Sequence, residues 1–487
     1  MLMDAKAGDG EVNIVGAGPN GLAAAVTFAR AGLRVRLFER EETVGGGARS
    51  AELTLPGFHH DVCSAVHPMA LASGFFRRFR LTDRVRFVVP EVSYGHPLGG
   101  DRAGLAYRSL AETVEALGRD GRAYLQLMRP LVDRADDLAQ LTGSALLRIP
   151  HHPVLEAEFG LRVAEQGSGL WNARFQDEVA PAMITGVAGH AVRTLPSLAA
   201  AGVALTLGAF AHARGWPVPV GGSEAIAQAL ADDFREHGGE IVTGVEVSDL
   251  DELPSARANL LDVSPRALAA IAGRRLPDRY LSALSAFRYG NGVAKVDFAL
   301  SAPVPWSNTE LHRTATVHLG GTREEIARAE REVALGRHSA KPYVLVAQPS
   351  LFDSSRAPEG KHTLWAYTHV PHGSDLDQTD AIVRQIERFA PGFRDTILAS
   401  SSMSARQLSE HNPNYVGGDI SGGLLSLSQL VARPVLSADP WRTPGRGIYL
   451  CSASTPPGPS VHGLAGWYAA RSALKHEFGL GTPSLAP

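Results

Sequence analysis

The chain has 487 residues, which is more than one ordinary hydrophobic core needs and favours two domains. Hydrophobic residues make up 44% of the chain and charged residues 20%, which is typical of a folded soluble protein and excludes a disordered or fibrous one. The net charge of −3 gives no electrostatic reason to expect nucleic-acid binding. Two cysteines, Cys63 and Cys451, are too few for a disulfide scaffold or a zinc site and favour a reducing compartment.

No segment of the sequence is expected to cross a membrane. The N-terminus, MLMDAKAGDG, lacks the long apolar core of a signal peptide. The longest mildly apolar run, Leu198–Ala211, has fourteen residues, which is shorter than a membrane span and predicts a buried helix. We therefore expect a cytoplasmic protein, with peripheral membrane contact as an open alternative.

The N-terminal segment has the pattern of a nucleotide-binding fold. Glu11–Val15 is a short apolar strand, Gly21–Ala31 is a helix of small residues, and Arg34–Glu39 is a second strand with alternating polarity. The GxGxxG element Gly16–Gly21 lies between the first strand and the helix, which is where a dinucleotide site requires it.

Each glycine of this element has a physical role. Gly16 permits the tight turn, Gly18 lets the backbone approach a pyrophosphate, and Gly21 lets the helix pack closely on the strand. The helix N-terminus offers N–H groups and a positive dipole to the phosphates. Glu39, at the end of the second strand, can accept hydrogen bonds from the adenosine ribose hydroxyls. The predicted site also includes Pro19, Asn20 and Arg40.

A glycine cluster after Glu39 favours FAD over NAD. Gly45–Gly47 lets the backbone pass close to a second phosphate or to the flavin edge, and Arg49 can pair with pyrophosphate oxygens. An NAD domain would continue directly into another helix and strand. The alternative is a flexible loop. The residues predicted to contact FAD here are Gly46, Gly47, Ala48 and Arg49.

The middle of the chain mixes helical and strand-like patterns. Residues 76–210 carry mainly helical periodicity, including Leu110–Leu117 and Tyr124–Thr142, and Ser223–His237 reads as a helix followed by a strand, Glu240–Val247. Residues 280–410 combine strands and amphipathic helices. The expected strands are Gly292–Leu300, Thr316–Leu319, Tyr343–Gln348 and Thr363–His369, and the expected helices are Arg323–Ala334 and Gln378–Phe389.

The C-terminal segment is the second informative stretch. A strand at Gly447–Cys451 runs into a Pro- and Gly-rich loop and then into a helix from about Gly463 to Leu474. Such a turn can place the Val461–Gly463 amides and a helix dipole near the flavin N1–C2=O2 edge, where negative charge develops on reduction. The alternative is a plain strand–loop–helix connection.

Several of these segments resemble the phytoene desaturase-like flavoproteins. The resemblance is strongest at the start, VGAGPNGLAAAVTFARAGLRVRLFER with EETVGGGARS, and at the end, GIYLCSASTPPGPSVHGLAGWYAARSAL. Further matches are FHHDVCSAVHP, GWPVPVGGSEAIAQAL and HNPNYVGGDISGG, and the match is weaker over residues 76–210. Within these flavoproteins the chain looks most similar to the pyridine-nucleotide-disulphide-oxidoreductase-domain-containing-2 branch.

The resemblance implies an α/β fold in which a glutathione-reductase-type, Rossmann-like FAD-binding domain is interleaved with an α+β substrate domain. We assign residues 1–75, 215–275 and 415–487 to the FAD-binding domain and residues 76–214 and 276–414 to the substrate domain. Members of the family desaturate, isomerise or saturate apolar polyenes and related molecules.

Carried over to this chain, the family's pattern adds further cofactor contacts. They are an adenine contact at Val245 or Val247 and flavin-side contacts at Ser452, Ala453, Val461 and His462. Three features depart from the pattern. Ala453 stands where many relatives have aspartate, a departure that the carotenoid desaturases share. Ser460 stands where relatives usually have glycine, and the segment Val242–Pro265 is too short for the usual β-meander.

The candidate catalytic residues are histidines. No metal-ligand cluster, CxxC motif or Ser-His-Asp order stands out, so the flavin itself is expected to carry the reaction. His462 at the flavin loop and His60 in the segment after Arg49 are the candidates, and a structural hydrogen bond is the alternative for each.

We therefore expect an FAD-dependent oxidoreductase that desaturates or oxidises an apolar small molecule of polyene, isoprenoid or other secondary-metabolite type, with oxygen or a quinone as electron acceptor. A flavin-dependent isomerase or saturase is one alternative. A flavin-fold interaction protein with weak or no FAD binding is another, and Ser460 and the short Val242–Pro265 segment favour it. The glycine cluster and the C-terminal segment disfavour a purely NAD-dependent dehydrogenase.

Overall fold

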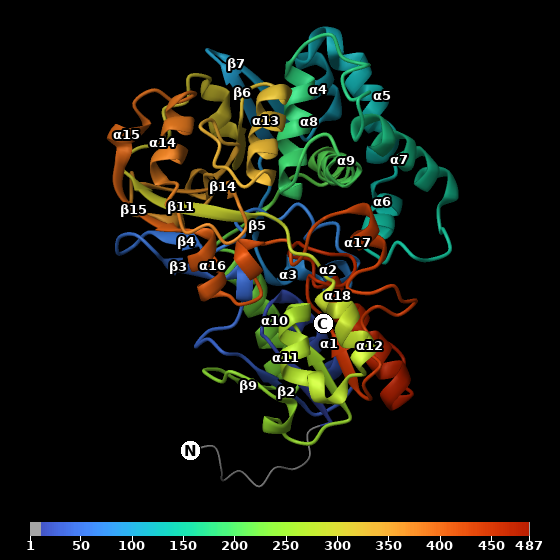
Figure 1. Ribbon diagram of the computed structural model, residues 1–487. Coiled ribbons are helices and arrows are strands. Elements are labelled where there is room, and N and C mark those ends of the chain that lie inside the picture. Colours follow the sequence, from blue (N-terminus) through green and yellow to red (C-terminus); the bar gives the residue numbers. More distant parts are fainter. Residues whose placement is uncertain (1–10, 487) are drawn as a thin grey trace.

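The computed structural model describes residues 11–486, so the N-terminus in which no signal peptide is expected lies outside the described residues. The chain forms two bodies, a nucleotide-binding-type body below and a larger mixed body above in the view of Figure 1. Two sheets organise these bodies, one with five strands and one with seven.

The five-stranded sheet is parallel and has the strand order β16-β10-β1-β2-β9. Its strands are β1 (Val12–Val15), β2 (Val35–Phe38), β9 (Glu240–Val242), β10 (Ala258–Leu261) and β16 (Ile448–Leu450). They come from three separate stretches of the chain, at the start, near residue 250 and near the C-terminus. β9 ends at Val242, earlier than the predicted strand Glu240–Val247, and no strand separates β9 from β10 within the described residues.

Three helices pack together beside the parallel sheet: α1 (Pro19–Arg30), α10 (Glu224–Glu236) and α18 (Leu464–Ala473). Small residues let α1 and α18 approach closely, since a Cβ at Gly466 would lie only 1.8 Å from the carbonyl oxygen of Asn20. Pro19 opens α1, where its fixed φ and missing N–H cost the helix nothing. Two further helices, α11 (Pro265–Ala272) and α12 (Asp278–Ser285), follow β10.

The seven-stranded sheet is mixed, with the order β15-β11-β14-β13-β12-β6-β7. Its strands are β6 (Val92–Gly99), β7 (Arg102–Tyr107), β11 (Gly292–Leu300), β12 (Thr316–Leu319), β13 (Val344–Ala347), β14 (His362–Val370) and β15 (Ile397–Met403). Both faces of this sheet are buried. Leu345 and Ala347 of β13 belong to one core cluster, whereas Val344 and Val346 belong to another.

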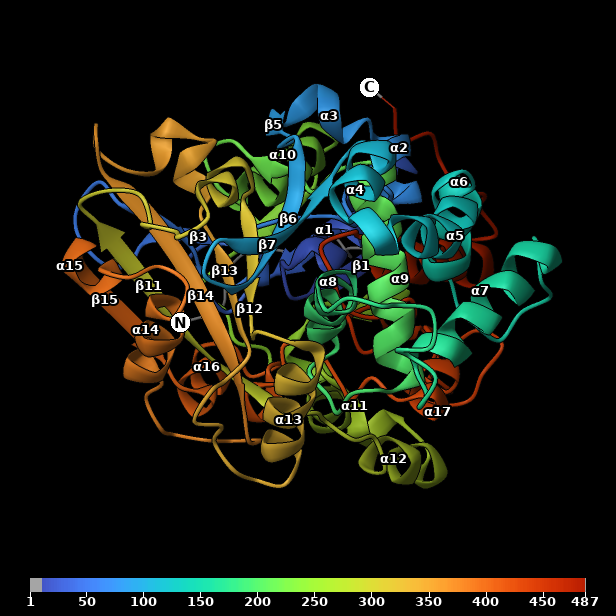
Figure 2. The ribbon, with the colours of Figure 1, turned by 90° about the horizontal axis from the view of Figure 1, so that it is seen from above.

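Helices cover each face of the mixed sheet (Figure 2). α8 (Val179–Ala188) and α9 (Leu198–Ala213) share one core with Leu345, and α14 (Thr379–Glu387) shares the other with Val346. α9 is apolar on all sides, which is typical of a buried helix and confirms that prediction. The other helices of this body are α4 (Leu110–Ala116), α5 (Gly121–Val132), α6 (Ala135–Thr142), α7 (Pro153–Gln166), α13 (Arg323–Ala334), α15 (Phe393–Thr396) and α16 (Ala405–His411).

Smaller elements connect the two bodies. They are the strand pairs β3 (Ser50–Glu52) with β4 (His59–Asp61) and β5 (Phe87–Val88) with β8 (Val218–Pro219), and the helices α2 (Gly74–Phe79), α3 (Leu81–Arg84) and α17 (Leu427–Val431). None of the helices in residues 11–486 combines the length and the apolar composition that crossing a membrane requires.

The structure corrects two predictions in the mainly helical region 76–210. β6 and β7 form a hairpin there, although Gly95 and Pro97 make their sequence read as a loop. The predicted helix Tyr124–Thr142 is two helices, α5 and α6. It breaks at Arg134, whose φ of −119° and ψ of 37° are not helical.

Buried histidines make the folded chain sensitive to acid. Burial lowers their pKa values from 6.5 to between about 3 and about 4 at His60, His67, His96, His190, His212 and His462. They stay neutral in the folded chain while the unfolded chain takes up protons near pH 6.5, so stability is lost as the pH falls from there towards 4. We expect the urea concentration at the unfolding midpoint to decrease as the pH is lowered from about 7 to about 5.5. Most carboxylates do not yet titrate in this range. A constant midpoint over this range would contradict the burial of these imidazoles.

Candidate functional site

A cavity of about 840 Å³ connects the carboxyl edge of the parallel sheet with the helical side of the upper body. Val15, Phe38 and Asp262, at or just after the ends of β1, β2 and β10, line one end of it. Ligands of open α/β sheets bind outside the carboxyl ends of the strands. The cavity is therefore where this fold holds a nucleotide.

The predicted cofactor residues gather at this end. Those that line the cavity are Gly16, Gly18, Pro19, Asn20, Glu39, Arg40, Gly46, Gly47, Ala48, Arg49, Val245, Val247, Ser452, Ala453 and Val461. Gly21 does not line it and instead serves packing, because a Cβ there would lie 1.9 Å from the Gly16 carbonyl oxygen. Gly16 has a φ of +97°, which the tight turn requires and which glycine adopts without strain.

Glu39 is held in a fixed orientation at the rim of the site. One carboxylate oxygen accepts a hydrogen bond of 2.7 Å from the backbone N–H of Ala17, and the other accepts one of 3.0 Å from the backbone N–H of Glu41. Arg49 lies 3.5 Å from the same carboxylate. Glu39 therefore connects the glycine turn to the segment after β2 and presents a buried carboxylate to the cavity.

Two buried polar atoms beside the glycine turns have no partner among the described residues, namely Nε of Arg49 and Oδ1 of Asn20. Buried polar groups are nearly always hydrogen-bonded, so an unpaired guanidinium N–H points to a missing acceptor. The two glycine turns also approach each other closely at this place, because a Cβ at Gly46 would lie 3.0 Å from the Gly18 Cα. A cationic donor beside two closely approaching glycines fits a pyrophosphate.

Asp262 is a site residue that no sequence motif predicts. It follows β10, and its carboxylate accepts a hydrogen bond of 2.9 Å from the Gly21 N–H in the first turn of α1. Burial raises the pKa of Asp262 to about 7, with the Gly21 hydrogen bond opposing this rise and the Glu39 carboxylate adding to it. Only its position directly after an apolar strand could have indicated its place at the carboxyl edge of the sheet.

His462 does not face the cavity, which corrects the prediction that it contacts the flavin region. Its Nε2 donates to the carbonyl of Gly458 at 3.2 Å, and its Nδ1 accepts from the N–H of Leu464 at 3.0 Å. Both ring nitrogens are thus used inside the loop, and burial lowers the pKa of His462 to about 4. The imidazole fixes the turn that enters α18, while Val461 lines the cavity.

Ser460 adopts a strained backbone conformation in the same loop. Its φ of +136° lies in the region that favours glycine, the residue that the family resemblance implies at this position. Ser460 also lines the cavity, so the strain lies at the site itself.

Replacing Ser460 by glycine is expected to stabilise the folded chain by about 1–2 kcal/mol, because the strain at this φ disappears. The measurement is the free energy of unfolding in urea, with Ser255→Gly at an exposed loop position as control. An unchanged or lower stability of Ser460→Gly would show that the serine side chain contributes more than its backbone costs.

His60 also lies away from the cavity, which corrects its assignment as a catalytic candidate. It is buried, with Nε2 hydrogen-bonded to Thr54 Oγ1 at 2.8 Å and Nδ1 3.8 Å from Asp297. Burial, and the positive charge of Lys295 beside it, lower the pKa of His60 to about 3. It is a neutral structural residue of β4.

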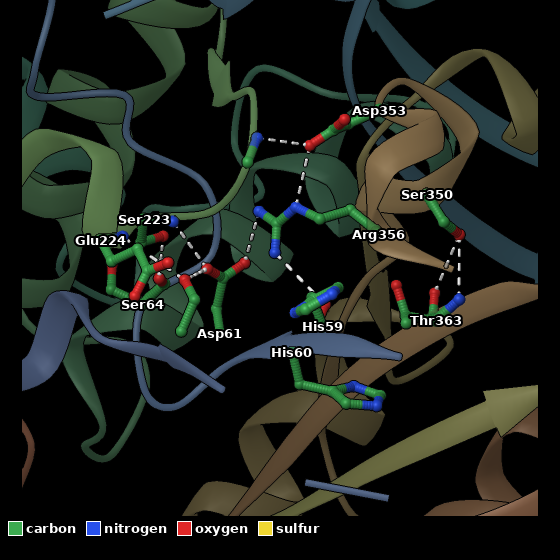
Figure 3. Close-up of polar contacts among 12 residues, drawn as sticks. His59, His60, Asp61, Ser64, Ser223, Glu224, Ser350, Asp353, Arg356 and Thr363 are labelled. Atoms are coloured by element: carbon green, nitrogen blue, oxygen red, sulfur yellow. Dashed lines mark hydrogen bonds and ion pairs between the residues drawn. The ribbon is translucent and has the colours of Figure 1, made fainter. Parts of the chain in front are cut away.

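Beside His60, Asp61 anchors a buried ionic network (Figure 3). Its carboxylate forms an ion pair of 3.0 Å with Arg356 and accepts hydrogen bonds of 2.8 Å from Ser50 Oγ and from the Ser223 N–H. Arg356 also pairs with Asp353 at 3.0 Å, and its side chain is fully buried. The network connects β3 and β4, the start of α10 and the loop before β14.

The far end of the cavity is a mainly apolar wall built by helices and by the mixed sheet. Its side chains include Phe159, Val163, Leu198, Val203, Leu207, Trp216, Leu345, Trp365, Leu425 and Leu430. No local motif in the sequence predicts a binding residue here, since these side chains come from five distant stretches of the chain. Their shared surface is apolar and partly aromatic, as ligand pockets usually are.

Comparison with known proteins agrees with this architecture. Residues 14–79 match the NAD(P)-binding Rossmann-like domain family. The pyridine nucleotide-disulfide oxidoreductase domain-containing protein 2 of Rattus norvegicus is 27% identical, covering 94% of this chain and 92% of its own length. The phytoene dehydrogenase of Streptomyces griseus is 27% identical over 80% of this chain and 77% of its own length.

Among solved structures, an engineered triple variant of putrescine oxidase superposes with a TM-score of 0.61 at 18% identity, covering 96% of this chain and 98% of its own. This likeness shows a shared fold. The sequence matches confirm the resemblance that the terminal motifs carry. The chain has a Rossmann-like dinucleotide-binding domain, shares the fold of a flavin-type oxidase and is similar in sequence to the phytoene dehydrogenase of Streptomyces griseus.

Proposed function

We propose that the protein oxidises an apolar small molecule of polyene or isoprenoid type, with oxygen or a quinone as the final electron acceptor. The observation that carries this proposal is the continuity of the cavity. One end has the glycine turns, Glu39 and Arg49, and the other has the apolar wall around Phe159 and Leu207. A substrate lying against this wall would meet the cofactor end without leaving the cavity.

The residues that would hold FAD are those of the nucleotide end. Arg49 would pair with the pyrophosphate, the N-terminus of α1 would donate N–H groups to it, and Glu39 would accept from the ribose. The Val461 region, ahead of α18, would lie at the flavin end. Bound FAD supplies a two-electron acceptor for a hydride from the substrate.

The apolar wall has two roles in this proposal. It excludes water from the reacting carbon, and it orients a substrate that offers few polar groups of its own. Among the described residues, cationic side chains line the cavity only at its nucleotide end, where Arg40 and Arg49 lie. An anionic substrate would therefore have no cationic partner at the apolar end. This lack of positive charge favours a neutral substrate.

The test is anaerobic incubation of the FAD-loaded protein with a panel of polyenes and isoprenoids, and with primary amines for comparison. The proposal predicts loss of oxidised-flavin absorbance with the apolar panel, and a product lower in mass by two hydrogens. In a parallel incubation in which dithionite supplies the electrons by reducing the flavin first, an unchanged product mass would indicate an isomerase, and a mass higher by two hydrogens a saturase. Reduction by the amines alone would contradict the proposal.

Glu39→Ala is expected to weaken FAD binding about ten- to a hundredfold. It removes charge-assisted hydrogen bonds to the ribose, each worth about 1.5–3 kcal/mol. The measurement is a fluorescence titration of the apoprotein with FAD. Glu240→Ala is the control, because Glu240 is an exposed carboxylate on β9 that pairs only with Arg36 in the described chain. Equal affinities of the wild type and Glu39→Ala would contradict the ribose assignment.

A further inference from the structure

One imidazole stands in the apolar half of the cavity. His190 lies in a short 3-10 turn, Gly189–Ala191, directly after α8, and lines the cavity beside Trp216 and Leu345. The indole of Trp216 packs edge-on against its ring at a centroid distance of 5.7 Å. Of the other histidines in residues 11–486, only His411 lines the cavity, and it ends α16 near Glu41 and Arg49 at the nucleotide end. His190 is therefore the one imidazole at the mainly apolar end among the described residues, where Thr316, Trp365 and Tyr367 also carry polar atoms.

His190 is hydrogen-bonded to a second, fully buried histidine. Its Nε2 lies 3.0 Å from Nε2 of His318 on β12, so one of the two nitrogens donates and the other accepts. Aromatic rings hold His318 in place, with Tyr94 at 5.3 Å and Tyr343 nearly parallel at 6.3 Å. No carboxylate forms an ion pair with either imidazole within the described chain, and burial lowers the pKa values of both, so the pair is neutral.

A neutral imidazole pair can exist in two proton arrangements. In one, His190 donates through Nε2, so its Nδ1 is a bare acceptor. In the other, His318 donates through its own Nε2, so the Nδ1 of His190 carries the proton and is a donor. The Nδ1 of His318 has no partner in the described chain in either arrangement, so the protein does not favour one strongly. His190 can thus offer the cavity a donor or an acceptor without acquiring a charge.

Nδ1 of His190 makes no hydrogen bond to any described residue, although its ring lines the cavity. A polar atom without a hydrogen bond in apolar surroundings destabilises the folded protein, unless a ligand or a water molecule forms that hydrogen bond. The ligand group cannot be a carboxylate or an ammonium, since no charged side chain of the described residues lies at this end of the cavity. A neutral oxygen is the group that both proton arrangements can serve.

We propose that His190 binds a hydroxyl or carbonyl oxygen on an otherwise apolar substrate and so sets the position of that substrate along the cavity. This inference rests on the proposed function and adds the chemical class of the substrate, an oxygenated apolar molecule in place of a pure hydrocarbon. A hydroxyl donates to bare Nδ1, and a carbonyl accepts from protonated Nδ1. His190 is a specificity-determining residue in this account.

The experiment compares farnesol with farnesene, two isoprenoids of similar shape of which only the first carries an oxygen. Binding to the FAD-loaded protein is followed through tryptophan fluorescence, because Trp216 and Trp365 line the cavity. One hydrogen bond of ordinary net strength predicts that the wild type binds farnesol about two- to tenfold tighter than farnesene. His190→Phe keeps the ring volume and should bring this ratio to about one. His190→Asn keeps a donor and an acceptor near the Nδ1 position and should restore much of the preference.

The flavin absorbance of each variant reports that it is folded and loaded. Equal affinities of the wild type for the two probes, or an unchanged preference in His190→Phe, would overturn the inference while leaving the apolar cavity of the proposed function intact. Failure of both probes to bind the wild type would contradict the proposed function and the inference together. Restored preference in His190→Asn would exclude a purely structural role of the ring.

Discussion

Gly18→Val is expected to abolish retention of FAD while leaving a folded chain. Gly18 caps α1 and lines the cavity, and a Cβ on it would lie 2.8 Å from Oδ2 of Asp262. The branched side chain of valine would also occupy the space through which a pyrophosphate reaches the N-terminus of α1. The measurement is visible absorbance after gel filtration, with far-ultraviolet circular dichroism reporting the helices and sheets.

The control for this substitution is Gly169→Val. A Cβ on Gly169 would meet no described atom within 4 Å, and the residue lies outside the cavity lining, so this variant should keep its FAD. Full FAD occupancy in Gly18→Val would contradict the assignment of the glycine turn to the pyrophosphate. Loss of circular dichroism in Gly18→Val alone would instead show that the turn is needed for folding.

Arg356→Met is expected to destabilise the folded chain by about 3–5 kcal/mol, because it leaves two buried carboxylates without their cation. Asp61 and Asp353 each lie 3.0 Å from the guanidinium, and the arginine side chain is fully buried. Methionine keeps much of the side-chain volume, so the loss reports charge and hydrogen bonding more than packing. The measurement is the free energy of unfolding in urea at neutral pH.

Two further variants test the origin of this loss. Arg313→Met removes an exposed arginine that pairs with Glu91 and Glu310, and should cost less than about 1 kcal/mol. Asp61→Asn combined with Arg356→Met removes one of the uncompensated charges and should recover part of the stability. Equal losses in Arg356→Met and Arg313→Met would show that the network around Asp61 is not a buried ionic structure.

The elements that the sequence predicts well have local signals. α1 and α18 follow glycine or proline turns, and α13 begins with a capping box at Thr322. The hairpin of β6 and β7 lacks such signals. β6 is buried along nearly its whole length and contains Gly95, His96 and Pro97, so neither alternation nor β-branched residues mark it as a strand.

The nucleotide end of the site is also predicted well, because its signals are local in the sequence. Gly16, Gly18 and Glu39 belong to one short βαβ segment, in which spacing alone fixes the geometry. Asp61 and Arg356 are separated by 295 positions in the chain, and the fold alone brings them together. His462 adjoins cavity-lining Val461 in the sequence, but its side chain points into its own loop. Proximity along the chain therefore predicts the backbone of the site better than the direction of each side chain.

The central claim is that the glycine turns, Glu39 and Arg49 hold FAD. The most direct test is the visible spectrum of the purified protein, together with the mass of the cofactor released on denaturation. A yellow protein that releases FAD in an amount equal to the chain is the predicted result. A colourless protein that fails to take up added FAD would contradict the account and would indicate a flavin fold without its cofactor.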